Sequence, residues 1–163
     1  MHSRPDVHID TFRQDDQPAF AALNRAWLIE HDLLEAPDEQ QLTDPAGQIL
    51  VPGGEIFVAR RNGEVVGTCA VLPHEDGVHE LLKLAVAPAA QGLGLGRRLV
   101  EACIARARER GAHRLVLLSS SKLGAALRLY EGLGFRPAPM PAKAPYVTAD
   151  VFMDLDLTAL PAA

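Results

Sequence analysis

The sequence predicts an α+β layered domain built on a mixed, mainly antiparallel central sheet of about six or seven strands. Two observations point to this class. An Asn62-Gly63 pair lies between two β-rich runs, which is the strongest short-range signal for a β-hairpin, because both residues tolerate positive φ. Further along, a strand-like run, a glycine-rich segment and an amphipathic helix follow one another, as in a helical crossover between parallel strands.

The first third of the chain predicts one strand and a long helix. Apolar and polar residues alternate at 7–12, which indicates a short strand. A helix is expected from Asp16 to His31, where apolar residues recur at helical spacing and an aspartate at 15 or 16 is available as the N-terminal cap. The stretch that follows is rich in Pro and Gly and predicts short helices near Pro37–Leu42 and Pro45–Leu50, then a loop.

The remainder alternates strands with helices. Gly111 and Gly134 follow two of the helical segments, where a left-handed C-cap is typically glycine. Parallel pairing is expected only where a helix crosses between Ala87 and His113. The predicted strands are Glu55–Arg61, Glu64–Leu72, Val78–Ala87, His113–Leu118, a short one entered at Phe135–Arg136, and Asp150–Leu157, and the predicted helices are 95–110 and Lys122–Leu133.

Length, composition and charge exclude several classes of protein. A chain of 163 residues with 48% hydrophobic and 23% charged residues is typical of one globular domain, here spanning 1–163. Lys and Arg total 16 against 21 for Asp and Glu. The net charge of −5 argues against a nucleic-acid partner and favours small cationic partners. No apolar run approaches the ~18 residues of a membrane span, so a membrane partner is not expected.

Cysteine usage and the N-terminal segment favour a cytoplasmic setting. Cys69 and Cys103 fall in a predicted strand and a predicted helix face, without a CxxC pattern, and are expected to be free core thiols. Met1–Asp10 carries charge and Pro where a signal peptide would need an apolar stretch. A reducing, cytoplasmic location is therefore predicted.

The segment Gln91-Gly92-Leu93-Gly94-Leu95-Gly96 follows a strand and opens a helix. Glycines let a ligand approach the backbone closely, and the N–H groups and dipole of a helix start favour phosphate oxygens. A Walker loop would need a second Gly five residues after Gly92, where Arg97 lies, and the spacing GxGxG does not fit the dinucleotide fingerprint GxGxxG. The segment therefore predicts an anion cradle of another kind.

Two motifs resemble one known family. Gln91, Gly94 and Gly96 match the pattern Gln/Arg-x-x-Gly-x-Gly/Ala, and Ala125–Phe135 is similar to the signature A-x-x-L-Y-x-x-x-G-F. These two motifs and the order of the predicted elements resemble those of the GCN5-related N-acetyltransferase (GNAT) superfamily. The resemblance covers nearly the whole chain. The resemblance implies a central sheet with helices on both faces and a glycine loop that holds the pyrophosphate of acetyl-CoA.

The resemblance also implies which residues contact acetyl-CoA, and it implies no metal. Main-chain N–H groups near Leu84–Val86 would meet the oxyanion and the pantetheine arm. Many relatives carry an Asn where this chain has Ser119–Ser121, so a hydrogen bond from Ser120 and capping of the next helix by Ser121 both stay open. The implied cofactor-binding residues are Leu84, Ala85, Val86, Gln91, Gly92, Leu93, Gly94, Leu95, Gly96, Arg97 and Ser120.

Acetyl transfer to an amine needs a base for the amine and a proton for the departing thiolate. Glu80 is the candidate base, directly or through water, because a glutamate occupies what looks like the same position in the histone-acetylating branch of the family. A strand glutamate paired with Lys83 is the alternative interpretation. His74 is a weaker rival base, and His79 is expected on the opposite face of the sheet.

Tyr130 is the candidate general acid that protonates the thiolate. It falls within the motif that resembles the family signature, although its helical spacing with Leu127 and Leu133 also fits a core aromatic residue.

The acceptor site is expected in the segment between the first strand and the hairpin. Trp27, Glu30 and His31 combine a large aromatic ring with nearby carboxylates, which would attract a cationic amine. A core Trp27 and a solvated acidic helix edge are the alternatives. The segment Arg136–Tyr146 is predicted to be either an acceptor-site loop or a contact in a homodimer.

The sequence thus predicts an acetyl-CoA-dependent N-acetyltransferase. The acetyl group would move to a primary amine, either of a small molecule or amino acid or of a protein lysine or N-terminus, by direct transfer in a ternary complex. The alternative is a non-catalytic acyl-CoA-binding sensor or interaction domain.

Overall fold

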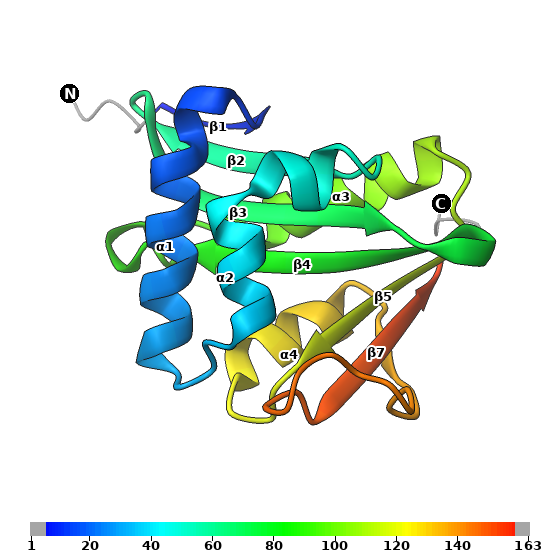
Figure 1. Cartoon of the computed structure of the whole chain (residues 1–163). Coiled ribbons are helices and arrows are strands. Elements are labelled where there is room, and N and C mark those ends of the chain that lie inside the picture. The colour runs from blue at the N-terminus through cyan, green and yellow to red at the C-terminus, as the bar shows by residue number, and fades with distance from the viewer. Residues whose placement is uncertain (1–5, 159–163) are drawn as a thin grey trace.

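The computed structural model describes residues 6–158 and arranges them around one seven-stranded sheet (Figure 1). The strand order is β1-β2-β3-β4-β5-β7-β6, and every neighbouring pair is antiparallel except β4 and β5. The predicted mixed sheet, with its parallel pair at the crossover, is confirmed. The strands are β1 Val7–Thr11, β2 Glu55–Arg61, β3 Glu64–Pro73, β4 Val78–Val86, β5 Arg114–Ser119, β6 Arg136–Pro137 and β7 Val151–Asp156.

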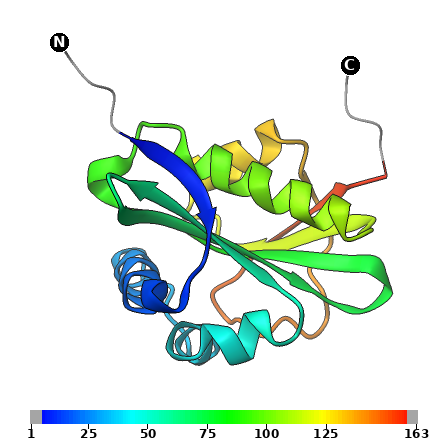
Figure 2. The same ribbon diagram turned by 90° about the horizontal axis from the view of Figure 1, so that it is seen from above.

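Helices cover both faces of the sheet, as the resemblance implied (Figure 2). On one face lie α1 (Gln17–Glu30) and α2 (Ala36–Thr43), and on the other lie α3 (Leu95–Glu109) and α4 (Gly124–Gly132). A π-helical turn, η2 (Ala46–Leu50), occupies the second predicted short helix, and the 3-10 turns are η1 (Gln14–Asp16), η3 (Glu75–Gly77) and η4 (Pro88–Ala90). Part of the N-terminal segment Met1–Asp10 and both ends of the predicted domain 1–163 lie outside the described residues.

Two apolar clusters hold the helices to the sheet. Leu99, Cys103 and Ala107 follow one another at intervals of four residues on one face of α3 and are fully buried in the larger cluster, and Cys69 of β3 joins them there. Both cysteines are free and buried. The smaller cluster joins α1, α2 and η2 to the other face through Phe20, Leu42, Ile49, Ile56 and Ala70. Within 6–158, no helix has both the length and the apolar content needed to cross a bilayer.

The predicted hairpin is confirmed, with its turn at Asn62-Gly63. Asn62 and Gly63 both have positive φ, 51° and 84°, as the tight hairpin turn requires. Arg61 pairs with Glu64 across the turn, the register shifts between Arg60 and Ala59, and the pairing then continues to Glu55 and Val71.

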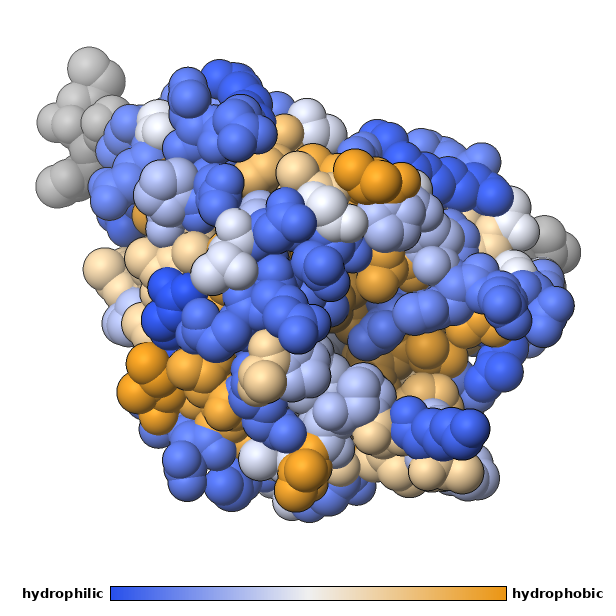
Figure 3. Space-filling view, in the orientation of Figure 1, coloured by the Kyte–Doolittle hydropathy of each residue, from blue (hydrophilic) through white to orange (hydrophobic). Residues whose placement is uncertain are grey.

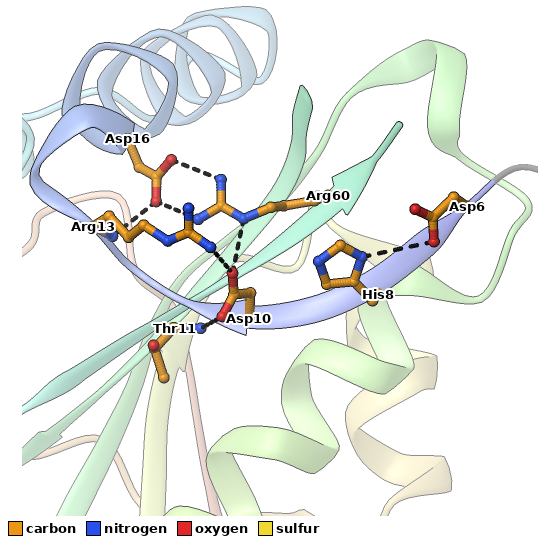
Figure 4. A network of polar contacts seen from close by, with 7 residues as sticks. All are labelled: Asp6, His8, Asp10, Thr11, Arg13, Asp16 and Arg60. Atoms are coloured by element: carbon orange, nitrogen blue, oxygen red, sulfur yellow. Dashed lines mark hydrogen bonds and ion pairs between the residues drawn. The ribbon is translucent and has the colours of Figure 1, made fainter. Parts of the chain in front are cut away.

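A buried arginine anchors the start of α1 to the sheet (Figure 4). Arg60 of β2 donates to both carboxylate oxygens of Asp16, at 2.8 and 2.7 Å, and to Asp10 of β1 at 3.0 Å. Asp16 occupies the N-cap position of α1, but its side chain makes no cap hydrogen bond. The cap prediction is therefore correct for the position and wrong for the interaction, because Arg60 and the Arg13 N–H bind the carboxylate instead.

Asp16→Asn should lower the free energy of unfolding by about 3 kcal/mol at pH 7, because the buried guanidinium loses a charged partner. Hydrogen bonds from Arg60 hold the pKa of Asp16 below its ordinary value of 3.8. The stabilisation by this carboxylate is therefore present above that value and lost as the pH falls through the lower folded-state pKa. Urea unfolding should show the largest difference at pH 7 and a smaller one near pH 3. Asp15→Asn, at an exposed neighbour, is the control; equal stability of the two variants at pH 7 would contradict the prediction.

Candidate active site

The sheet opens between its two parallel strands. β4 and β5 pair only at three positions, from Val78 with Arg114 to Glu80 with Val116. Beyond Glu80 the strands diverge, although β4 continues to Val86 and β5 to Ser119 (Figure 1). The edge of this part of β4 that faces β5 has no strand partner, so its backbone N–H and C=O groups are available to a ligand. The predicted cofactor contacts on this strand, Leu84, Ala85 and Val86, lie in this part of β4. The Val86 carbonyl accepts a hydrogen bond of 3.4 Å from the Gln91 side chain.

A cavity of about 110 Å³ lies in the wedge between the diverging strands. It brings together predicted residues from four segments: Glu80 and Leu84 of β4, Ser120 after β5, Tyr130 of α4 and Trp27 of α1. Figure 3 shows apolar residues within a hollow in this region, bordered by hydrophilic ones. The other lining residues are Asn24, Leu28, Leu33, Asp38, Leu81, Leu82, Lys83, Leu117, Leu118, Ser119, Leu123, Tyr146, Thr148 and Ala149.

Tyr130 both packs in the core and lines the cavity. Its side chain packs in the larger apolar cluster, 5.8 Å from Phe135 in an edge-on ring contact, and the residue is 8% exposed. It also lines the cavity. Burial raises the pKa of Tyr130 well above its ordinary value, so the hydroxyl keeps its proton at neutral pH. The protonated hydroxyl can therefore donate a hydrogen bond in the cavity, and its role as the general acid stays a prediction.

The two candidate bases form one hydrogen-bonded pair. Glu80 Oε1 lies 2.7 Å from His74 Nε2, and the Glu80 side chain is 19% exposed. The hydrogen bond with Glu80 raises the pKa of His74. The alternative interpretation, in which Glu80 pairs with Lys83, is wrong, because Lys83 forms an ion pair with Asp38. His79 is buried on the α3 side, where burial, and to a lesser extent Arg110, lower its pKa.

Sequence reasoning missed a buried ion pair in the same cavity. Lys83 Nζ lies 2.5 Å from Asp38 Oδ1, and 5.6 Å from the centroid of the Tyr146 ring. The three side chains come from β4, α2 and the segment before β7. No local pattern in the sequence indicates their meeting, because it depends on how α2 and that segment pack over the sheet.

Lys83 lies in a β-bulge. The register changes between Thr68 paired with Ala85 and Ala70 paired with Leu82, so β4 carries one extra residue there. Lys83 has φ of 59°, a left-handed conformation that few residues other than glycine adopt. Its carbonyl accepts a hydrogen bond of 2.9 Å from the Thr68 hydroxyl, which helps to hold the bulge.

The glycine loop lies between β4 and α3. Gly92 and Gly94 have φ of 86° and 73° and are exposed. The first hydrogen bond of α3 runs from the Arg98 N–H to the Gly94 carbonyl at 3.2 Å, so the N–H groups of 95–97 precede it and are free for an anion. Arg97 is exposed and 3.6 Å from Glu101.

The other loop residues contribute in different ways. Gln91 and Leu93 are exposed, whereas the Leu95 side chain is buried in the core, which leaves only its N–H for a ligand. A Cβ on Gly96 would lie 3.4 Å from the Leu129 side chain, which is an ordinary contact distance, so the packing of α3 on α4 leaves room for a methyl group there.

The segment Ser119–Ser121 does not cap α4. The Ser121 N–H and hydroxyl donate to the Asp150 carboxylate at 2.8 and 2.6 Å, and the N-cap of α4 is Leu123. Ser120 is buried beside the cavity, and its hydroxyl accepts a hydrogen bond from the Lys122 N–H at 3.2 Å. Of the two alternatives for this segment, capping by Ser121 is wrong, and Ser120 lies at the cavity.

The predicted acceptor residues are only partly brought together. Trp27 lines the cavity, and His31 lies outside it with its ring 4.8 Å from the Trp27 ring. Glu30 is exposed at the end of α1 and does not reach the cavity.

The segment 138–150, which we call the strap, covers the wedge instead. Its Tyr146 and Thr148 line the cavity, and the Glu35 carboxylate accepts the N–H groups of Val147 and Thr148 at 2.8 and 3.0 Å. This placement supports the acceptor-site interpretation of Arg136–Tyr146, and a homodimer contact there stays a prediction.

Solved acetyltransferases share this fold. An acetyltransferase of the GNAT family from Staphylococcus aureus Mu50 has a TM-score of 0.84 at 19% sequence identity, over 93% of this chain and 99% of that chain. YncA of Salmonella typhimurium, solved with its cofactor acetyl-CoA, has a TM-score of 0.73 at 27% identity, over 93% and 94% of the two chains.

Sequence comparisons define the family. A mycothiol acetyltransferase from Thermomonospora curvata is 37% identical over 110 residues, which are 68% of this chain and 34% of that protein. The uncharacterized N-acetyltransferase YjgM of Escherichia coli K12 is 34% identical over 128 residues, 74% of this chain and 76% of that protein. The model of the acetyltransferase (GNAT) family matches residues 10–135. The chain therefore belongs to the GNAT family of acetyltransferases, although it spans only about a third of the mycothiol acetyltransferase.

Proposed function

We propose that this protein is an acetyl-CoA-dependent N-acetyltransferase that transfers an acetyl group directly to a primary amine in a ternary complex. The acceptor classes are small-molecule amines, amino acids, and protein lysine or N-terminal amines. The observation that carries the proposal is the cavity between β4 and β5, which both Glu80 and Tyr130 line beside an open strand edge.

The residues present fit acetyl-CoA. The N–H groups at the start of α3 suit the pyrophosphate, because they are free and lie at the positive end of the helix dipole. A Cβ on Gly92 or Gly94 would meet no atom within 4 Å, so the loop is open to a ligand. The free edge of β4 at Leu84–Val86 suits the pantetheine arm. When bound, acetyl-CoA supplies the activated acetyl thioester.

The side chains in the cavity would handle the two protons of the reaction. An alkyl amine with a pKa near ~10 is mostly protonated at neutral pH, and Glu80 takes its proton directly or through water. His74, whose side chain is 47% exposed, can pass that proton to solvent. Tyr130 donates its hydroxyl proton to the leaving sulfur, and free N–H groups of β4 hold the carbonyl oxygen.

Gly94→Val should weaken acetyl-CoA binding by at least about tenfold in calorimetry. A β-branched side chain does not adopt the left-handed φ of this position, so the loop must change shape. Gly111→Val is the matched control. Gly111 also has positive φ and open space around its Cβ position, but it lies at the other end of α3. Wild-type affinity in Gly94→Val, or no affinity in the wild type, would refute the proposal.

A thiol-release screen distinguishes the enzyme from the alternative function, a non-catalytic acyl-CoA sensor. Acetyl-CoA is offered with amino acids, polyamines, aminoglycosides and basic peptides. Release with one class of amine supports the enzyme, whereas tight binding without release across the panel supports the sensor.

The buried free thiols Cys69 and Cys103 support the proposal of a reducing, cytoplasmic compartment.

A further inference from the structure

The charges around the cavity are unequally available to an acceptor. Among the described lining residues, Lys83 is the cation, and Asp38 and Glu80 are the carboxylates. Both oxygens of Asp38 are occupied: Oδ1 accepts from Lys83, and Oδ2 accepts the Glu35 N–H at 2.9 Å. Glu80 uses Oε1 for His74 and keeps Oε2 for an acceptor. Of the four carboxylate oxygens of Asp38 and Glu80, Glu80 Oε2 is thus the one that remains for an acceptor.

Lys83 has spare capacity as a hydrogen-bond donor. An ammonium group has three N–H donors, and Asp38 takes one of them. The Tyr146 ring covers another side of the group at 5.6 Å, and the side chain is only 6% exposed, so the remaining donor capacity faces the cavity rather than bulk water. An anionic oxygen is the partner that an ammonium in such a place binds best.

Because of the bulge, the side chains of Lys83 and Glu80 line the same cavity. Residues three apart in a regular strand point to opposite faces of the sheet. The extra residue in β4 shifts this alternation, and both side chains line the wedge. Holding a lysine there costs free energy twice, through its left-handed backbone and through the burial of its charge. Packing alone gives no reason for that cost, because an apolar residue or a glycine meets the needs of a bulge.

We propose, on the premise that the protein is the acetyltransferase described above, that its acceptor is a small amino-carboxylate. Lys83 binds the carboxylate of the acceptor, and Glu80 faces its amine. A zwitterion carries one carboxylate and one ammonium group. The free donor of Lys83 suits the carboxylate, and the free oxygen of Glu80 suits the ammonium group. The acceptor class is thus narrowed from cationic amines in general to amines that carry a carboxylate close by.

The test compares free amino acids with their C-terminal amides as acceptors. The kcat/KM of the wild type should favour the acid over its amide by about 10- to 100-fold, as expected for a hydrogen bond between buried charged groups. In Lys83→Met this ratio should fall toward one, and Lys83→Arg should restore part of it. Lys122→Met is the matched control, because Lys122 is exposed and does not line the cavity.

Binding is measured separately from turnover. Trp27 is the single tryptophan of the chain and lines the cavity, so its fluorescence reports acceptor binding with CoA present. The same ratio of acid to amide is expected in the dissociation constants. If Lys83→Met does not unfold cooperatively, Lys83→Met with Asp38→Asn replaces it, since this pair of changes leaves no buried carboxylate without its cation.

Each outcome decides the proposal. Amides that match the acids in the wild type, a preference kept in Lys83→Met, or an equal loss of preference in Lys122→Met overturns the role of Lys83 and leaves the acetyltransferase function standing. Absence of both acetyl-CoA binding and thiol release defeats the proposed function instead. A preference for acids that disappears with the Lys83 charge and returns with arginine supports the inference.

Discussion

We expect Tyr130→Phe to lower kcat by about 100-fold while acetyl-CoA binds with wild-type affinity. General acid catalysis contributes about 10²- to 10⁴-fold, and the substitution removes only the hydroxyl that would supply the proton. The phenyl ring still fills the same space beside Phe135, so the packing of α4 is kept. Stopped-flow thiol release gives kcat, and calorimetry gives the affinity.

A donor with a better leaving group separates proton donation from other roles of Tyr130. An acetyl thioester of a more acidic thiol needs less protonation of its sulfur, so the defect of Tyr130→Phe should shrink with that donor. Thermal unfolding of the variant checks that the core is intact. An unchanged kcat with acetyl-CoA would show that Tyr130 is not the acid.

The second large effect is expected for Glu80→Gln, which should lower kcat/KM by about 100-fold near neutral pH. The amide keeps nearly the same shape and a hydrogen bond to His74, but it cannot take a proton from the amine. The loss should be smaller at high pH, where more of the amine is already deprotonated. A variant with wild-type kcat/KM at pH 7 would rule out Glu80 as the base.

The hydrogen bond between Glu80 and His74 also sets the direction of the pH dependence. Glu80 raises the pKa of His74 above its ordinary value of 6.5, so the protonated pair is favoured below that raised value and is lost as the pH rises through it. A protonated His74 neutralises Glu80 and opposes uptake of the amine proton. Activity should therefore rise with pH above 6.5, as a property of the pair rather than of one residue.

His74→Gln should move this rising limb of kcat/KM to lower pH, because Glu80 no longer shares a proton with an imidazole. Profiles measured from pH 5 to 9 in one buffer system test the shift. The exposed His113, replaced by Gln in the same way, serves as the control. Superimposable profiles for the wild type and His74→Gln would contradict the coupling of the pair.

Elements that depend on near neighbours could be predicted from the sequence. The Asn62-Gly63 turn, the buried face of α3 and the glycine loop each follow from local conformational preference or apolar periodicity, and the structure has them at the expected positions. Asp16 shows the limit of this reasoning. Its position before α1 was predictable, but its carboxylate binds Arg60, which is 44 residues away in the sequence.

The chain alone was sufficient to predict the architecture and the family, because turn residues, periodicity and short motifs act over a few neighbouring positions. The roles of Glu80 and Tyr130 also come from the sequence and stay predictions. The partners inside the cavity required the folded molecule. Lys83 faces Asp38 and Tyr146 only because a bulge redirects β4 and because α2 and the strap pack across the sheet. Such long-range packing sets which charges stay free, and hence which acceptor the cavity is expected to bind.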